Sequence, residues 1–325
     1  MADIDAQGNK PRNKKKILST RQYDKIRDFI NHFHGVAIDC EFELQRHLCP
    51  DVERLTVKSI LQTELGNRLR SQHWRYEAKA STYLKIFSEQ SVVCSDNTLL
   101  LKISALEGMS PVVLCRSVLQ EKYKFQVKSQ LTRLMKWPHL IDDPRLAANV
   151  NMCLMCDNQD GPLADIKRRV LGEEYEFKLK VLAKAAGMHY YDELDLRRMG
   201  FDKTPDLKLI LPCLYKGEVV NWIESKAIFG DVKTHKWYVK HQLVSYCNRF
   251  GPGIVIYWFG YHEEIPSLAV NCNAIIVLAD FPDSKDLTFL DLAFNEAEEK
   301  YAGVDDLLQK IQYSKPPQTE LQNNN

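Results

Sequence analysis

Residues 204–226, TPDLKLILPCLYKGEVVNWIESK, decide the fold of this chain. Pro205 disfavours the helical conformation at Thr204, so the chain arrives extended and Asp206 begins a strand. The turn residues Lys216-Gly217-Glu218 then allow the chain to double back as a β-hairpin. We therefore predict two antiparallel strands, of which the first begins at Asp206.

The return strand of this hairpin ends in Glu224-Ser225-Lys226. Side chains two residues apart on a strand point to the same face, so Glu224 and Lys226 share one side of the sheet. Hairpin pairing brings Asp206 beside Glu224. The sequence thus predicts two carboxylates and one ammonium gathered at a sheet edge.

Outward from the hairpin, the pattern alternates between helix and strand. Residues 163–186 form one long helical pattern that ends at Gly187, and a second helix is expected at about 238–248. Strand-like runs lie at 207–211, 219–227, 254–259 and 274–278. The later runs are continuously apolar, which indicates strands buried on both faces. The prediction is an α/β fold with a mixed sheet.

The preceding region, from Ser19 to about Lys128, has helical periodicity. Within it, Gly108 marks a turn, Ser110 suits an N-cap and Pro111 suits the first helical position. This spacing is typical of a helix-turn-helix, whose second helix would bring Arg116, Lys122 and Lys124 near nucleic-acid phosphates. An ordinary helical corner is the alternative.

The punctuation of the chain suggests four parts. We expect a disordered basic tail over 1–18, a helical region with helix-turn-helix-like elements over 19–135, an α/β domain over 136–300 and a partly disordered tail over 301–325. The junction is placed at Lys136-Trp137-Pro138 and Asp142-Asp143-Pro144. Lys10 to Lys16 form a basic cluster, read either as a solvated tail or as a nuclear-import signal.

Composition narrows the class of protein. The 325 residues are 45% hydrophobic, which excludes a wholly disordered chain. Basic and acidic residues nearly balance over the whole chain, at 44 and 43. Residues 1–130, however, carry 21 basic and 15 acidic residues, and this net charge of +6 permits a nucleic-acid-facing region. No apolar run approaches the ~18 residues that a membrane span requires. The polar start and nine Cys predict reduced thiols in a cytosolic or nuclear protein.

Two acids and a lysine have a clear chemical use. Asp206, Glu224 and the main-chain carbonyl of Ser225 form the oxygen-rich donor set that Mg²⁺ prefers. Lys226 would then orient or help deprotonate a water and offset phosphate charge. A surface salt-bridge triad is the alternative. Trp222 and Ile223, which precede Glu224, indicate a buried strand and favour a functional role, because charged side chains in a buried strand are costly unless they are paired or functional.

The motif Pro205-Asp206…Glu224-Ser225-Lys226 resembles the PD-(D/E)xK nuclease signature. The run Tyr238-Val239-Lys240-His241-Gln242, followed by the apolar strand 253–259, is similar to archaeal Holliday-junction resolvases. The longer runs 200–206, 222–227 and 248–253 resemble most closely the codanin-interacting nuclease family, or TPD-motif proteins. The resemblance covers about residues 161–259.

This resemblance implies a restriction-endonuclease-like core and a Mg²⁺-dependent nuclease, with Mn²⁺ as a substitute. By position, Asp206 and Glu224 would bind metal, Lys226 would activate water, and Gln242, accompanied by Tyr238, would steady the site. A first-helix glutamate completes the resolvase pattern. Glu176 lies eleven residues before Gly187 and is our choice. Glu174 competes for this role because it shares a stripe with Val170, Phe177 and Val181 that we expect to meet the sheet.

The resemblance also implies partners and a location. Codanin would be the protein partner, DNA the favoured substrate, and the nucleus, with the cytoplasm, the location. Resolvases are dimers, so a homodimer stays open. A nuclease-fold interaction protein with weak or absent catalysis is the second hypothesis, and a helix-turn-helix transcription regulator is the third.

Three further patterns have competing interpretations. Cys153-x-x-Cys156 lacks a second Cys pair at zinc spacing, so a metal knuckle is disfavoured. Trp237, Tyr238 and Tyr246 either stack on bases or belong to the core. His235 and His241 either contact phosphate or water, or have a structural, hydrogen-bonded role.

Overall fold

A mixed six-stranded sheet forms the α/β part of the chain. The computed structural model describes residues 15–93, 95–268 and 274–289. The strands are β1 (Tyr190–Asp192), β2 (Leu207–Tyr215), β3 (Glu218–Lys226), β4 (Gly253–Tyr257), β5 (Ile275–Leu278) and β6 (Leu287–Phe289). Their order is β1-β2-β3-β4-β5, with β6 also paired to β2. The β3–β4 and β4–β5 pairs are parallel and the others antiparallel, as a mixed sheet requires.

The predicted hairpin is confirmed, but its register changes along its length. At the turn Tyr215 pairs with Glu218, and further along Leu207 pairs with Ile223. If the register at the turn continued unbroken, Leu209 would lie opposite Glu224. An irregularity between Lys208 and Cys213 shifts the pairing by three residues. Continued by one residue, the shifted register sets Asp206 opposite Glu224.

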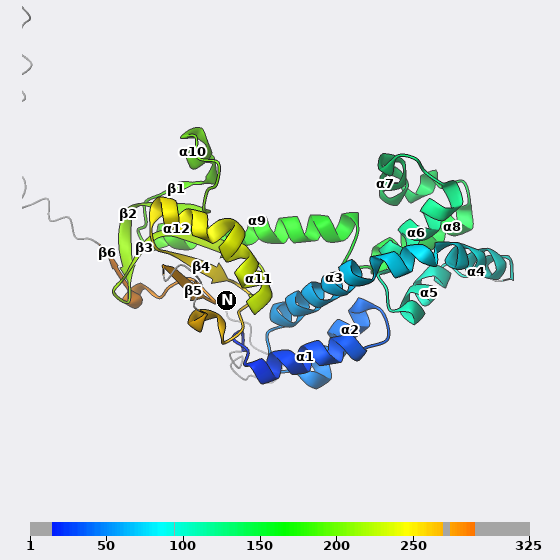
Figure 1. Cartoon of the computed structure of the whole chain (residues 1–325), viewed down its shortest axis with the longest axis horizontal. Coiled ribbons are helices and arrows are strands. Elements are labelled where there is room, and N and C mark those ends of the chain that lie inside the picture. Colours follow the sequence, from blue (N-terminus) through cyan, green and yellow to red (C-terminus); the bar gives the residue numbers. More distant parts are fainter. Residues whose placement is uncertain (1–14, 94, 269–273, 290–325) are drawn as a thin grey trace, which may run out of the picture.

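Helices cover the sheet and extend into a second lobe. They are α1 (Thr20–His32), α2 (Ala37–Glu43), α3 (Arg54–Ala78), α4 (Ala80–Val93), α5 (Leu99–Glu107), α6 (Pro111–Tyr123), α7 (Lys128–Lys136), α8 (Pro144–Cys156), α9 (Pro162–Ala185), α10 (Glu193–Arg198), α11 (Val232–Tyr238) and α12 (Val244–Phe250). Short π-helical segments η1 (Leu44–Leu48) and η3 (Val239–Leu243) and 3₁₀ turns η2 (Pro138–Leu140), η4 (Ile265–Ser267) and η5 (Ser284–Asp286) complete the list. In Figure 1 the sheet lies to the left, α4–α8 lie to the right, and the long helices α3 and α9 connect them. No helix among the described residues is long and apolar enough to span a membrane.

The first lobe's core includes residues from Leu18 onward, far ahead of the sheet in the sequence. Leu18, Ile30 and Leu61 are fully or almost fully buried in one cluster with strand residues of β2, β3 and β4. Two buried hydroxyls of α3 fix it to the loops around the sheet: Thr56 donates to the Phe259 carbonyl at 2.8 Å and Ser59 accepts from the Phe229 amide at 2.8 Å. The predicted helical region 19–135 is therefore not a separate unit, because its first third belongs to the sheet core.

The expected tail over 1–18 is also too long. Residues 15–18 are ordered: Lys15 bridges to Val52 and the buried Leu18 bridges to His262. The remainder of that tail, residues 1–14, and the predicted tail over 301–325 lie outside the described residues.

The second lobe has its own core, built by the end of α3 and by α4–α8. Its buried members include Tyr76, Phe87, Leu119, Met135 and Val150. Because α8 packs here, the junction between the lobes falls after Cys156 and not at the predicted residue 136. The loop that follows is tight: Gly161 has φ 92°, and a Cβ there would lie 3.1 Å from a Val112 side-chain carbon.

The corner between α5 and α6 has the predicted local chemistry but not the predicted role. Gly108 is left-handed at φ 62°, and the Ser110 side chain caps α6. However, Val112 at the start of α6 is buried, and its amide donates to the Asp157 carboxylate at 3.1 Å. A recognition helix reads bases with its N-terminal residues. Since this end of α6 is covered by the 157–161 loop, the recognition-helix interpretation is wrong and the pair is an ordinary helical corner.

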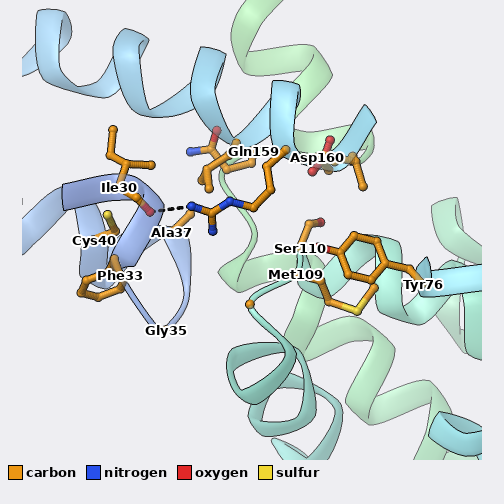
Figure 2. Close-up of a pocket in the computed structure, with 14 residues that line it drawn as sticks. Ile30, Phe33, Gly35, Ala37, Cys40, Tyr76, Met109, Ser110, Gln159 and Asp160 are labelled. Atoms are coloured by element: carbon orange, nitrogen blue, oxygen red, sulfur yellow. Dashed lines mark hydrogen bonds between the residues drawn. The ribbon is translucent and has the colours of Figure 1, made fainter. Parts of the chain in front are cut away.

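A small cavity lies where the two lobes meet (Figure 2). Arg68 of α3 lines it and donates to the Ile30 carbonyl at 2.6 Å. Asp160 also lines the cavity, near Ser110, and burial, followed by the charge of Asp157, raises its pKa. The cavity is thus lined from both lobes, by Ile30 and Cys40 of the first and by Gly108 and Met109 of the second.

Candidate functional site

Four structural elements converge on one open cleft at the edge of the sheet. Asp206 enters from the start of β2, Glu224 from the end of β3, Gln242 from η3 and Glu176 from α9. The cleft is lined by Glu176, Glu193, Arg197, Asp202, Lys203, Thr204, Asp206, Glu224, Trp237, His241, Gln242 and Tyr246. The hairpin register and the helix after β3 therefore bring the sequence-predicted acids and glutamine together.

Asp206 and Glu224 form a close pair of like charges. The Asp206 amide donates to Glu224 Oε2 at 3.3 Å, and the Ser225 amide donates to Asp206 Oδ2 at 2.7 Å. Glu224 is only 3% exposed. Burial, and then repulsion by the Glu224 charge, hold the pKa of Asp206 well above its usual value. A divalent cation between such carboxylates would relieve this repulsion.

Lys226 is the cation of the cluster. Its Nζ donates to Glu224 Oε1 at 2.5 Å and to Gln242 Oε1 at 3.0 Å, and it lies 4.6 Å from the centre of the Tyr238 ring. Burial alone would lower the pKa of Lys226, but the Glu224 charge and hydrogen bond outweigh it and the pKa is raised. Lys226 is therefore an ammonium at neutral pH.

Gln242 links the charged groups to the scaffold. Its Nε2 donates to Glu224 Oε1 at 2.7 Å and to the Tyr246 hydroxyl at 2.7 Å, and that hydroxyl donates to the Thr204 carbonyl at 2.6 Å. Gln242 lies on the π-helical segment η3, a rare local conformation that is frequent at functional sites. Sequence reasoning weighed Tyr246 only as a core or stacking residue; its position four residues after Gln242 was the signal for this contact.

The two first-helix glutamates are placed differently. Glu176 lines the cleft, and burial, followed by the charges of Glu193 and Glu224, raises its pKa. Glu174 lies outside the cleft. Its stripe was expected to meet the sheet, but Val170, Phe177 and Val181 are 51%, 69% and 49% exposed, so that expectation is wrong. The face of α9 that packs on the sheet core instead carries Leu171, Tyr175, Leu179, Leu182 and Ala183.

The predicted nucleic-acid contacts are not part of the cleft. Arg116, Lys122 and Lys124 lie on or just after α6 in the second lobe. Lys122 pairs with Asp143 at 3.0 Å and Lys124 with Glu121 at 2.5 Å. Tyr238 has Lys226 over its ring, so it supports the lysine of the site.

The donor set fits a hard cation. No cluster of three or more His, Cys, Asp or Glu residues occurs among the described parts of the chain that could hold a metal by itself. Mg²⁺ does not require one, since it binds through one or two carboxylates and completes its shell with water and substrate oxygens. In a strand, the N–H and C=O of one residue point to the same neighbour. The Ser225 carbonyl is thus directed to the side where Asp206 receives its amide, and Asp206, Glu224 and this carbonyl could together hold the ion.

The remaining residues singled out in the sequence, two cysteines and two histidines, lie in different surroundings. Cys153 is buried in the second core, while Cys156, on the same helix, contacts Met152. His235 is buried, its Nδ1 lies 3.0 Å from the Tyr257 hydroxyl, and burial lowers its pKa to about 4. His241, in contrast, lies on the cleft wall beside Trp237.

Fold and cleft together define a mixed-sheet α/β protein with two acids and a lysine gathered where adjacent strands meet. Comparison with known proteins makes this class specific. The chain is 36% identical over 281 residues to CDAN1-interacting nuclease 1 of Xenopus tropicalis, covering 82% of this chain and 89% of that protein. It is 31% identical over 276 residues to the Homo sapiens protein of the same name, covering 82% and 96%. The chain belongs to this family.

The other comparisons are consistent with that placement. A family model described as "Protein of unknown function TPD sequence-motif" matches residues 142–281. The Danio rerio CDAN1-interacting nuclease 1 is 34% identical over 251 residues, covering 75% of this chain and 83% of that protein. No solved structure gives a significant match.

Proposed function

We propose that this protein is a Mg²⁺-dependent nuclease of the PD-(D/E)xK type, for which Mn²⁺ can substitute, and that it hydrolyses phosphodiester bonds, preferably in DNA. The observation that carries the proposal is the acid–lysine cluster, in which Asp206 and Glu224 line an open cleft and Lys226 donates a hydrogen bond to Glu224. The relatives' name, which includes the word nuclease, supports it.

Each residue has a role that its contacts suit. Asp206, Glu224 and the Ser225 carbonyl would hold the cation, with Glu176 reaching it through water from the cleft wall. When bound, the cation supplies positive charge to the phosphate and lowers the pKa of a water. Lys226, being protonated, holds and orients the attacking water and offsets negative charge on the phosphate. Gln242 holds the side chains of Lys226 and Glu224 in a fixed position relative to each other, and Tyr246 holds Gln242 by a hydrogen bond.

The partner and the location follow from the family. The relatives are named for interaction with CDAN1, and we propose codanin as the protein partner of this chain, in the nucleus and the cytoplasm. A catalytically weak interaction protein is the alternative. Glu224 argues against it, since a scaffold has no need of a 3% exposed carboxylate that a neighbouring lysine, a glutamine and the Asp206 amide must stabilise.

The test is cleavage of labelled DNA and RNA by the purified chain with Mg²⁺, with Mn²⁺ or with chelator. Asp206→Asn and Lys226→Gln should each lower the metal-dependent rate by about 10²-fold or more. Asp283→Asn and Lys285→Gln are matched controls, because these residues form an exposed Asp–Lys pair at 3.3 Å outside the cleft. Cutting that survives in both cleft variants, while the melting curves show folded protein, would refute the proposal.

A further inference from the structure

We propose that Trp237 is a base-stacking platform and that the substrate of the cleft is a nucleic acid with an unpaired base next to the cleaved phosphate. This inference rests on the proposed nuclease function and specifies its substrate class. Trp237 comes from α11, and it lines the same cleft as Asp206, Glu224 and Gln242. Of the tryptophans in the described part of the chain, it alone does so.

The indole is exposed and yet held in place. Trp237 is 56% exposed, whereas Trp222 and Trp258 are buried. The His241 ring is stacked on it, with centroids 4.7 Å apart and planes 24° apart, and the Tyr238 ring meets it edge-on at 5.2 Å. His241 Nδ1 lies 2.8 Å from the Trp237 carbonyl, which fixes one ring relative to the other. A stacked aromatic pair thus stands at the cleft wall with apolar surface in water.

The other two aromatics weighed for base stacking are already occupied. Tyr246 is 2% exposed and bonded to Gln242 and Thr204. Tyr238 carries Lys226 over its ring. Core packing, the alternative for all three, therefore holds for Tyr246 but not for Trp237.

Positive charge lies beside the platform. Lys203 also lines the cleft, and its Nζ donates to the His241 carbonyl at 2.9 Å, which places an ammonium next to the stacked pair. An aromatic face next to a cation is the usual means of binding single-stranded nucleic acid, in which bases stack on the ring and the backbone meets the charge. Inside a duplex both faces of each base are covered by neighbouring bases. A side chain can therefore stack only on an unpaired, terminal or displaced base.

The experiment measures stacking and cleavage separately. Oligonucleotides carry the fluorescent base 2-aminopurine, which is quenched by stacking, in a single-stranded or a fully paired context. Binding is read with Ca²⁺ in place of Mg²⁺, and cleavage with Mg²⁺. The variants are Trp237→Ala and Trp237→Phe. Trp74→Ala is the matched control, since Trp74 is 69% exposed and lies on α3 outside the cleft.

We expect the wild type and Trp74→Ala to quench the single-stranded probe, and Trp237→Ala to lose most of that quenching. The Kd and KM of Trp237→Ala for single-stranded substrate should rise by about 10-fold, within the range for loss of one base–aromatic contact. Its kcat should stay within about threefold, and Trp237→Phe should recover most of the affinity. A merely structural role would instead lower kcat and affinity for both probes together.

The outcomes separate the two proposals. Quenching that depends on Trp237 without cleavage of any substrate refutes the nuclease and supports the platform. Cleavage that is equally efficient in Trp237→Ala, or equally impaired on single strand and duplex, refutes the platform and leaves the nuclease standing. Absence of single-strand binding by the wild type also refutes the platform.

Discussion

Glu224 and Asp206 differ in how the protein stabilises them, although they lie side by side. Glu224 receives hydrogen bonds from Lys226, Gln242 and the Asp206 amide. Asp206 receives one from the Ser225 amide, and its carboxylate accepts no other hydrogen bond within the described residues. Burial and the Glu224 charge raise its pKa, so the folded protein holds a proton on Asp206 more tightly than the unfolded chain does.

This asymmetry predicts a stability change with a defined sign. A raised pKa contributes stability at low pH, and that contribution is lost as the pH rises through the folded-state pKa. Without divalent ions, Asp206→Asn should therefore melt higher than the wild type at pH 7.5, by about 2 °C for each kcal/mol of relieved repulsion. The difference should shrink as the pH falls toward the ordinary range of a carboxyl group.

Melting curves in chelator at several pH values check this, and Mg²⁺ provides the control. Added Mg²⁺ should raise the Tm of the wild type and leave that of Asp206→Asn nearly unchanged, since ligands that bind only the folded state stabilise it. A variant that melts lower than the wild type at pH 7.5 would contradict the description of Asp206 as a strained carboxylate.

Most of the candidate residues could be predicted from sequence because their spacing is local. Glu224 and Lys226 share a face by strand alternation, and a short turn determines that the chain returns toward Asp206. The stripe that includes Glu174 misled because α9 has apolar residues on more than one side, and periodicity does not say which side meets the sheet. Hydrophobic periodicity also does not predict the π-helical segment that carries Gln242, since that conformation has no clear sequence signature.

At the scale of elements, the irregularity in β2 decides which side chain meets Glu224. Ile210 and Leu211 in this stretch are exposed, and Pro212 has no amide to offer to the ladder. The sequence predicted a hairpin but not this change of register, because a bulge depends on how both neighbouring strands pair and not on the turn alone.

The register makes a prediction that two deletions test. Removal of residues 210–212 should leave a regular hairpin in which Asp206 still lies opposite Glu224, so metal-dependent cleavage should persist within about tenfold. Removal of residues 211–212 alone would set Asp206 opposite Ser225 and turn its side chain to the other face, so cleavage should be lost.

Cleavage assays on both proteins, with melting curves to show that each is folded, give the answer. The two variants share the same site of deletion and differ by one exposed residue, so each is the control of the other. If both folded variants cut equally well, strand register is not what positions Asp206.

At the scale of the whole molecule, the two hydrophobic cores do not follow the predicted division of the chain. Residues between 18 and 61 complete the sheet core, while residues 144–156 belong to the helical core. Sequence punctuation at Pro138 and Pro144 marked real helix starts, but it could not show which core each helix joins, because that choice depends on contacts far apart in the chain.

A fragment experiment tests this division. Residues 136–289 contain the whole sheet and all of the TPD match, yet they lack Leu18, Ile30 and Leu61, which lie in the sheet core. Loss of several such side chains, each worth about 2–5 kcal/mol, exceeds the stability of most domains. The fragment should therefore fail to show a cooperative melting transition by circular dichroism, whereas residues 15–289 should show one. A fragment that melts cooperatively would restore the predicted boundary.

Helix α9 links the second lobe mechanically to the cleft. It begins beside Gly161, whose backbone is pressed against Val112 of the second lobe, and it carries Glu176 to the cleft about 22 Å further along. An α-helix of this length behaves as a stiff rod. A protein that binds the α4–α8 lobe and tilts it therefore also moves Glu176 at the rim of the cleft, without contacting the cleft itself.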